Sequence, residues 1–184
     1  AVRGGVGDVA VKGQAGPNEH VMSASTKADV MALNRLAEEE RRRVGLVGGP
    51  PVSVGGYSVA VGDRIVFREK DRRLGVNNGT FGTVLAASGT TLVIRPDGES
   101  RDGRPRPEVM VNTLKYDKIE LSYGITAFRA QGSTFDASYV LLGGEGTSRQ
   151  LSYVVGSRER ESVHFYCDRF EAGYVLEQLA AGKV

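Results

Sequence analysis

Hydrophobic positions in the first quarter of this chain follow a strand pattern and then a helix pattern. A short apolar strand is expected at residues 20–24, before TKAD at 26–29, which resembles a capping box. Val30, Leu33 and Ala37 then recur at helical spacing, which predicts a helix of about 18 residues with one buried face. A strand followed by a capped helix is typical of one unit of an α/β sheet.

Short alternating strands replace this pattern in the middle of the chain. Residues 45–56, GLVGGPPVSVGG, predict a Gly/Pro linker and a module boundary. The strands expected after it are short and apolar, at residues 64–68, 83–87, 90–95, 109–111. Asn77-Asn78-Gly79 predicts a hairpin turn, because both turn residues must tolerate positive φ. So many short strands in about 55 residues predict a small SH3-like β-barrel over residues 57–115.

The α/β pattern of longer strands and helices returns after residue 116. The expected elements are a buried strand at 137–142, an amphipathic helix at 148–159, a strand at 163–167, and a closing helix at 170–181. The α/β pattern is therefore interrupted in sequence by the β module. This split predicts one discontinuous α/β domain, residues 1–56 and 116–184, with the barrel as an insertion.

Composition narrows the classes of protein to consider. The net charge of +2 is too small to argue for nucleic acid by itself, although residues 57–118 hold eleven Lys/Arg against eight Asp/Glu. One cysteine, Cys167, excludes an intrachain disulfide, and with only two histidines there is no zinc set. No apolar run approaches the roughly 18 residues of a membrane span, and no signal peptide is visible. We therefore expect a cytoplasmic protein with no membrane partner and no structural metal.

Two stretches carry the groups best suited to phosphate chemistry. The first is Tyr123–Asp136, YGITAFRAQGSTFD, and the second is Leu151–Tyr166, LSYVVGSRERESVHFY. Hydroxyl, amide and guanidinium groups donate hydrogen bonds to phosphate oxygens, and a glycine lets the backbone approach one closely. The two stretches are therefore the candidate functional region of the chain.

Both stretches resemble motifs of one helicase family. YGITAFRAQGSTFD is similar to motif V of superfamily-one DNA helicases of the RecD-like branch, and LSYVVGSRERE is similar to their motif VI. STKADVMALNRLA resembles the motif IV region, and VGDRIVFREKDRRLGVNNGTFGTV resembles the module before motif V in the helicase half of conjugative relaxases. The resemblance covers about residues 20–168. It implies a second RecA-like motor domain, with a parallel sheet, that carries an inserted SH3-like barrel.

The family resemblance also implies roles for particular residues. Arg158 is similar to the arginine finger that reaches ATP held by a first motor domain, and Arg160 is the neighbouring basic position, with pairing to Glu161 as the alternative. Gly132 would let the backbone approach a phosphate. The positions that resemble single-stranded DNA contacts are Thr126, Phe128, Arg129, Gln131. Phe128 stands where the family usually has histidine, and it could stack on a base.

The sequence lacks half of an ATP site. It contains no G-x-x-x-x-G-K-[ST] phosphate loop. We therefore expect ATP and Mg²⁺ to be cofactors of a longer parent, with neither bound tightly by this chain alone. The expected partners are single-stranded DNA and the first motor domain of the same protein. The alternative is a non-catalytic DNA-binding or protein-docking module of helicase ancestry, and relaxase and repair helicase also stay open.

Several residues also have simpler interpretations. Thr126 is equally explained as a helix cap, and Gln131-Gly132 as a helix C-terminus. His164, between two apolar residues, is expected to be structural. The arginines of the 96–107 loop, Arg101, Arg104 and Arg106, are expected to be solvated, with phosphate contact as the minority interpretation.

Overall fold

The computed structural model describes residues 20–100, 102–126, 135–141 and 159–167. The chain divides into two compact units. One unit combines Ala1–Ala37 with Tyr123–Val184, and the other is Glu38–Ser122. The helix α2, Lys27–Arg43, begins in the first unit and ends in the second. Among the described residues, no helix combines the length and apolarity needed to cross a bilayer.

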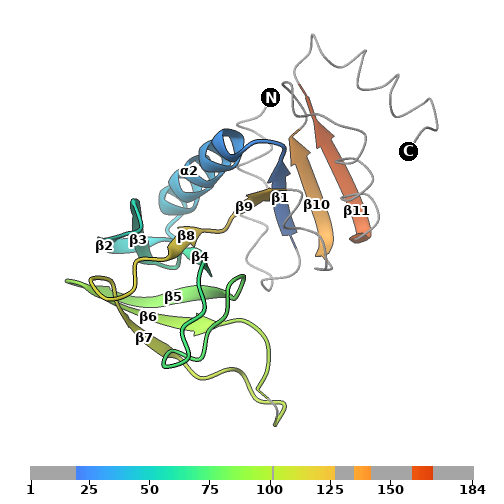
Figure 1. Cartoon of the computed structure of the whole chain (residues 1–184). Coiled ribbons are helices and arrows are strands. Elements are labelled where there is room, and N and C mark those ends of the chain that lie inside the picture. The colour runs from blue at the N-terminus through green and yellow to red at the C-terminus, as the bar shows by residue number, and fades with distance from the viewer. Residues whose placement is uncertain (1–19, 101, 127–134, 142–158, 168–184) are drawn as a thin grey trace. The chain divides into compact units, whose positions relative to one another are not determined.

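The first unit is built on a parallel sheet (Figure 1). Its four described strands are β1 His20–Ala24, β9 Gly124–Thr126, β10 Phe135–Leu141, β11 Glu159–Tyr166. They lie in the order β11-β10-β1-β9, and every neighbouring pair is parallel. The strands predicted at 20–24 and 137–142 are confirmed. The last strand begins at Glu159, four residues before the predicted start at 163.

Helix α2 begins where the capping pattern predicts. The Thr26 Oγ1 accepts a hydrogen bond from the Asp29 backbone N–H at 3.1 Å, and its own proton goes to Asp29 Oδ2 at 2.6 Å. Thr26 is therefore the N-cap, and Asp29 lies in the first turn, where a negative charge is favourable. Leu33 and Ala37 are buried as the periodicity predicts, whereas Val30 is only half-buried.

The second unit consists of antiparallel strands. A five-stranded sheet has the order β7-β6-β5-β4-β8, and β2 and β3 form a separate two-stranded sheet. The bounds are β2 Gly48–Val54, β3 Tyr57–Val61, β4 Arg64–Phe67, β5 Phe81–Ser88, β6 Thr91–Pro96, β7 Val109–Asn112, β8 Ile119–Leu121. Ile65, Phe67, Leu92 and Ile94 lie in its core. The described sheets are not closed into one barrel.

The linker predicted at 45–56 is wrong, because most of this segment is strand β2. Val52 and Val54 are buried and pair with β3, so the alternation V-S-V is a strand pattern. Pro50 and Pro51 are tolerated because the pairing register shifts between Gly48 and Val52, in a sheet of only two strands. The antiparallel unit therefore begins before residue 57.

The turn at Asn77-Asn78-Gly79 exists but does not form a two-residue hairpin. Thr80 N–H donates to the Asn77 carbonyl at 3.0 Å, and Gly79 has φ of 87°. No non-glycine residue within the described ranges has positive φ, so Asn78 does not take the predicted conformation. The reversal from β4 to β5 uses residues 68–80, because a second small hairpin at 71–76 precedes the turn. The helix predicted at 170–181 lies outside the described residues, as does the one predicted at 148–159 except for Glu159, which begins strand β11.

Candidate functional site

The carboxyl edge of the parallel sheet brings several polar groups together. The strand register aligns Ala24, the last residue of β1, with Thr126 of β9 on one side and with Leu141 of β10 on the other. Open sheets of parallel strands bind ligands at the carboxyl ends of those strands. The structure therefore places Thr126 at the edge where a ligand is expected.

Thr126 lies on the face of the sheet that α2 covers. Successive side chains of a strand point to opposite faces, so Thr126 shares a face with Gly124 and Ile125 takes the other. A Cβ built on Gly124 would lie 3.3 Å from the Leu33 Cβ, which identifies the shared face as the one against α2. Ile125 is only 2% exposed and belongs to the core, while Thr126 is half-buried and within reach of solvent.

The start of α2 contributes the positive end of a helix to the same edge. The first helical hydrogen bond runs from Val30 N–H to the Thr26 carbonyl at 3.1 Å. The backbone N–H groups ahead of it have no partner inside the helix, and helix N-termini favour anions for that reason. The Thr26 hydroxyl is already engaged by Asp29, so it acts as a cap.

Ser25, between β1 and α2, has a buried hydroxyl oxygen with no hydrogen-bond partner among the described residues. Buried hydroxyls are normally paired, and this one lies one residue beyond the strand end, beside the N-cap. A ligand atom or a water molecule at the carboxyl edge would satisfy it. The Ser25 hydroxyl is thus one polar group at this edge that a ligand could satisfy.

Asn34 fixes the strand that carries Thr126. Its side-chain Nδ2 donates to the Gly124 carbonyl at 3.1 Å, and its Oδ1 accepts the Gly124 N–H at 2.8 Å. Asn34 is only 3% exposed. Because β9 is the last strand in the described order, the side-chain amide of Asn34 supplies hydrogen-bond partners to the β9 backbone. Sequence reasoning missed this residue. The available signal was a polar side chain beside Leu33 on the buried helix face.

The structure places only two of the predicted site residues. Thr126 ends β9, and Arg160 is the second residue of β11. Glu159 aligns with Phe135, and Tyr166 aligns with Leu141, so Arg160 belongs to the amino end of its strand. Thr126 and Arg160 therefore lie at opposite edges of one sheet. The remaining predicted residues lie outside the described residues, namely Phe128, Arg129, Gln131, Gly132, Arg158.

Histidine and metal chemistry add nothing to this site. The His164 ring stacks on Tyr139 with centroids 4.9 Å apart and planes 10° apart, and its Nε2 is 3.2 Å from the Ser162 Oγ. Within the described residues, no group of three His, Cys, Asp or Glu side chains could hold a metal ion. The groups that the described residues bring to the carboxyl edge are the hydroxyls of Ser25 and Thr126 and the N-terminus of α2.

The fold is shared with Pif1 helicases. A structure described as two coordinating Pif1 helicases unwinding forked double-stranded DNA matches with a TM-score of 0.57 and 20% identity, covering 96% of this chain and 48% of the other. Bacteroides Pif1 in complex with ADP-AlF3 and single-stranded DNA also matches with a TM-score of 0.57, at 18% identity, covering 96% of this chain and 50% of the other. These similarities establish the class of fold, a helicase fold with a mixed α/β architecture.

The sequence relatives are conjugal transfer proteins. TraA of Rhizobium radiobacter is 31% identical over 146 residues, which is 78% of this chain and 13% of TraA. TraI of Escherichia coli K12 is 32% identical over 115 residues, 60% of this chain and 6% of TraI. No family model matches the chain. The resemblance predicted from the motif stretches is confirmed: the chain is homologous to a region of TraA and TraI, and it spans a small part of their length.

Proposed function

We propose that this chain forms the second motor domain of an ATP-dependent DNA helicase of the kind found in conjugative relaxases. The observation that carries the proposal is the alignment of 78% of the chain with TraA at 31% identity. The Pif1 fold supports it, since Bacteroides Pif1 was solved bound to single-stranded DNA. In this role the chain supplies motifs IV, V and VI, and the first motor domain supplies the phosphate loop.

Single-stranded DNA binds at the carboxyl edge of the parallel sheet in this proposal. The hydroxyls of Ser25 and Thr126 and the N-terminus of α2 would donate hydrogen bonds to one phosphate group. Phe128, Arg129 and Gln131 follow Thr126 within five residues of the chain, so the same segment can add a stacking ring, a positive charge and an amide. Asn34 supports the site by holding the backbone at Gly124.

ATP and Mg²⁺ would meet the opposite edge of the sheet. Arg160 belongs to the amino end of β11, and Arg158 precedes that strand by one residue. A planar guanidinium makes two parallel hydrogen bonds to phosphate oxygens, and it stabilises the negative charge that develops there. Gly132 would leave room for a phosphate close to the backbone. When bound, Mg²⁺ would neutralise charge on the phosphates, and Arg158 would add its guanidinium.

The antiparallel strands complete the proposed architecture. We infer that residues 57–115 belong to an SH3-like barrel inserted into a discontinuous RecA-like domain, residues 1–56 and 116–184. The five-stranded sheet and the β2-β3 hairpin supply strands of the right number and length for such a barrel. Strands β2 and β8 lie outside residues 57–115 and pair with β3 and β4 of the antiparallel unit.

Arg158→Lys tests the proposed nucleotide role in a protein that contains both motor domains. Arginine fingers contribute about 10³–10⁵ in turnover, and lysine cannot make the bidentate contact. DNA-stimulated ATP hydrolysis should therefore fall severely, while single-stranded DNA affinity stays unchanged. Arg160→Lys is the matched control and should cost less if Arg160 pairs with a carboxylate. Near-normal turnover of Arg158→Lys would reject the finger assignment. Absence of any ATP hydrolysis by the unmodified protein would favour the non-catalytic module.

A further inference from the structure

Strand β7, Val109–Asn112, has one edge with no partner strand among the described residues. It is the last strand in the order β7-β6-β5-β4-β8, and it pairs with β6 alone (Figure 1). The edge strand of a sheet presents a row of backbone N–H and C=O groups that can pair with another strand. The open edge of β7 is therefore a place where the sheet can be extended.

The hydrogen-bond pattern shows which backbone groups face this open edge. Thr113 N–H donates to the Thr90 carbonyl at 2.8 Å, and this pair continues the register of β6 and β7. Hydrogen-bonded and non-hydrogen-bonded pairs alternate along an antiparallel ladder, so Met110 and Asn112 direct their backbone groups away from β6. The Asn112 carbonyl is occupied by the turn that follows it. The open edge thus offers the N–H and the carbonyl of Met110 and the N–H of Asn112.

Apolar side chains are exposed in this strand and just beyond it. Met110 is 70% exposed, and Leu114, two residues past the end of β7, is 81% exposed. The next most exposed large apolar side chain of the described residues is Met31, at 56%. An exposed apolar side chain on an open strand edge favours addition of another strand. A partner strand that covers Met110 would remove this side chain from water.

The sequence around β7 fits a second copy of the same strand. In an antiparallel pair centred on Met110, the Met110 N–H of each copy donates to the Met110 carbonyl of the other. Asn112 then lies opposite Glu108 of the second copy, and its N–H donates to the Glu108 carbonyl. Glu108 continues the ladder, because the register places it opposite Arg95 and the two side chains form an ion pair at 3.0 Å. The pairing has two-fold symmetry, as most protein dimers do.

The side chains that would face each other across the pair are complementary. Asn112 Oδ1 accepts the Leu114 N–H at 3.0 Å, which leaves Nδ2 to donate to the Glu108 carboxylate of the second copy. On the other face of the sheet, Val111 of one copy would lie opposite Val109 of the second. Val111 is fully buried, so this contact extends the apolar core of the sheet. Polar and apolar pairs of this kind stabilise neighbouring strands.

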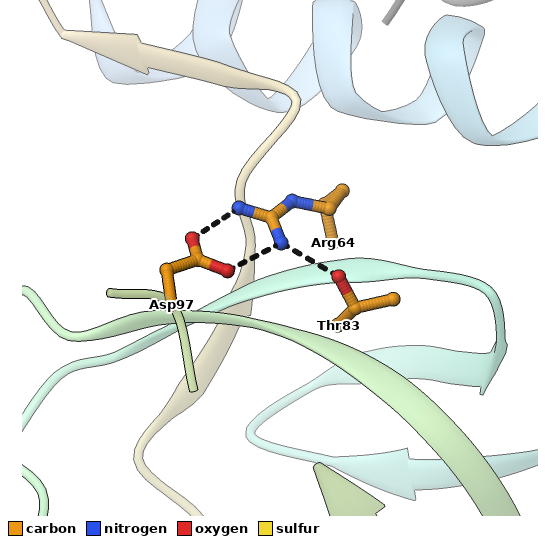
Figure 2. A network of polar contacts seen from close by, with 3 residues as sticks. All are labelled: Arg64, Thr83 and Asp97. Carbon is orange, nitrogen blue, oxygen red and sulfur yellow. Dashed lines mark hydrogen bonds and ion pairs between the residues drawn. The ribbon is translucent and has the colours of Figure 1, made fainter. Parts of the chain in front are cut away.

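The sheet behind β7 is held together by a polar network. Arg64 of β4 forms a bidentate ion pair with Asp97, one residue past the end of β6, and its Nη1 also donates to the Thr83 Oγ1 of β5 at 2.6 Å (Figure 2). The Arg64 and Asp97 side chains are only 16% and 18% exposed, so solvent and salt screen this pair less than a surface pair. Three strands are joined in this way. A second copy would therefore pair with a preformed sheet, which lowers the ordering cost of association.

We propose that two copies of this chain associate through β7, in an antiparallel pair with a two-fold axis at Met110. The inference does not depend on the proposed helicase function. Stable interfaces between proteins bury about 1,200–2,000 Å². A strand of four residues covers less than this, so the expected dimer is weak and forms as the protein concentration rises.

Sedimentation velocity of the full chain over a range of protein concentrations tests the association. Met110→Lys places two ammonium groups opposite each other at the axis, and like charges so placed oppose association. Its dimerisation should be weaker than that of the wild type by about tenfold or more. Met31→Lys is the matched control, because it replaces an exposed methionine of α2, and it should dimerise like the wild type. Thermal melting followed by circular dichroism checks that both variants are folded.

Disulfide trapping tests the register of the pair. Hydrogen-bonded residues of an antiparallel pair have Cα atoms about 5.5 Å apart, within the range of about 4.4–6.8 Å that a disulfide spans. The native thiol is first removed by Cys167→Ser. In that background, Met110→Cys should form a cross-linked dimer on mild oxidation, and Met31→Cys should form far less under the same conditions.

Three results would overturn the proposal. The first is a wild-type chain that stays monomeric at every concentration, which would leave the β7 edge to a strand of a different protein. The second is a dimer that Met110→Lys weakens no more than Met31→Lys does. The third is equal trapping of the two cysteine variants, because the two-fold axis would then not lie at Met110.

Discussion

Replacing Asn34 with alanine should loosen the strand that carries Thr126. The substitution removes both partners of the Gly124 backbone, the Nδ2 donor at 3.1 Å and the Oδ1 acceptor at 2.8 Å. A buried group left without a partner costs about 1–3 kcal/mol, so two such groups cost about 2–6 kcal/mol. The cost is local, because both hydrogen bonds are to one residue of β9. Each 1.4 kcal/mol corresponds to about a tenfold change in a local opening equilibrium.

Amide hydrogen exchange measured by NMR reports on this opening residue by residue. The Gly124 amide in Asn34→Ala should exchange about 30-fold to 10⁴-fold faster than in the wild type, while amides of β5 and β6 in the other unit keep their rates. Arg35→Ala is the matched control, since Arg35 is the next residue of α2 and is exposed. The reasoning is refuted if Gly124 exchanges equally slowly in all three proteins, because the side-chain amide would then contribute nothing to holding β9.

Two further predictions concern nucleotide and pH. The isolated chain should show no magnesium-dependent ATP hydrolysis, since its sequence has no phosphate loop, and turnover abolished by a substitution in this chain would contradict that expectation. Backbone N–H groups, first that of Leu74, hold the pKa of Asp71 below its ordinary 3.8. A lowered folded-state pKa stabilises the 71–76 hairpin above 3.8, and this stabilisation is lost as pH falls through the lower folded value. NMR shifts of the Arg73 and Leu74 amides should therefore change in acid in the wild type and stay constant in Asp71→Asn.

Local signals in the sequence predicted the elements whose patterns were self-contained. The β1 strand, the Thr26 cap of α2 and the strands β4 to β7 all have an apolar alternation or a capping residue within a few positions. The same reasoning failed at Gly48–Val54. Two glycines and two prolines dominate the local propensity at residues 48–51, and pairing of Val52 and Val54 with Val59 and Tyr57 makes the segment a strand. The available local signal was the Gly55-Gly56 turn between two alternating segments, which is typical of a hairpin.

The candidate site was predictable only in part, because its supporting contacts join segments that are far apart in the sequence. Thr126 was identified from its motif, and the structure adds that it ends an edge strand beside Ala24. Asn34 lies ninety residues from the glycine it contacts, so no spacing rule reveals the pair. The unpaired Ser25 hydroxyl is likewise visible only in three dimensions. Side chains that support a site from a distant segment are therefore the part that sequence patterns miss.

The central claim, that this chain holds single-stranded DNA through the segment after β9, is tested most directly by titrating labelled oligo-dT with the chain and with two variants. Thr126→Val removes the hydroxyl and keeps the shape of a β-branched residue, and Arg129→Ala removes the predicted charge. Arg35→Ala serves as the charge-matched control. The account predicts weak binding whose log–log salt slope is near −0.7 per phosphate neutralised, a shallower slope for Arg129→Ala, and reduced affinity for both site variants. Wild-type affinity in Thr126→Val and Arg129→Ala, or no binding by the unmodified chain at low salt, would contradict it.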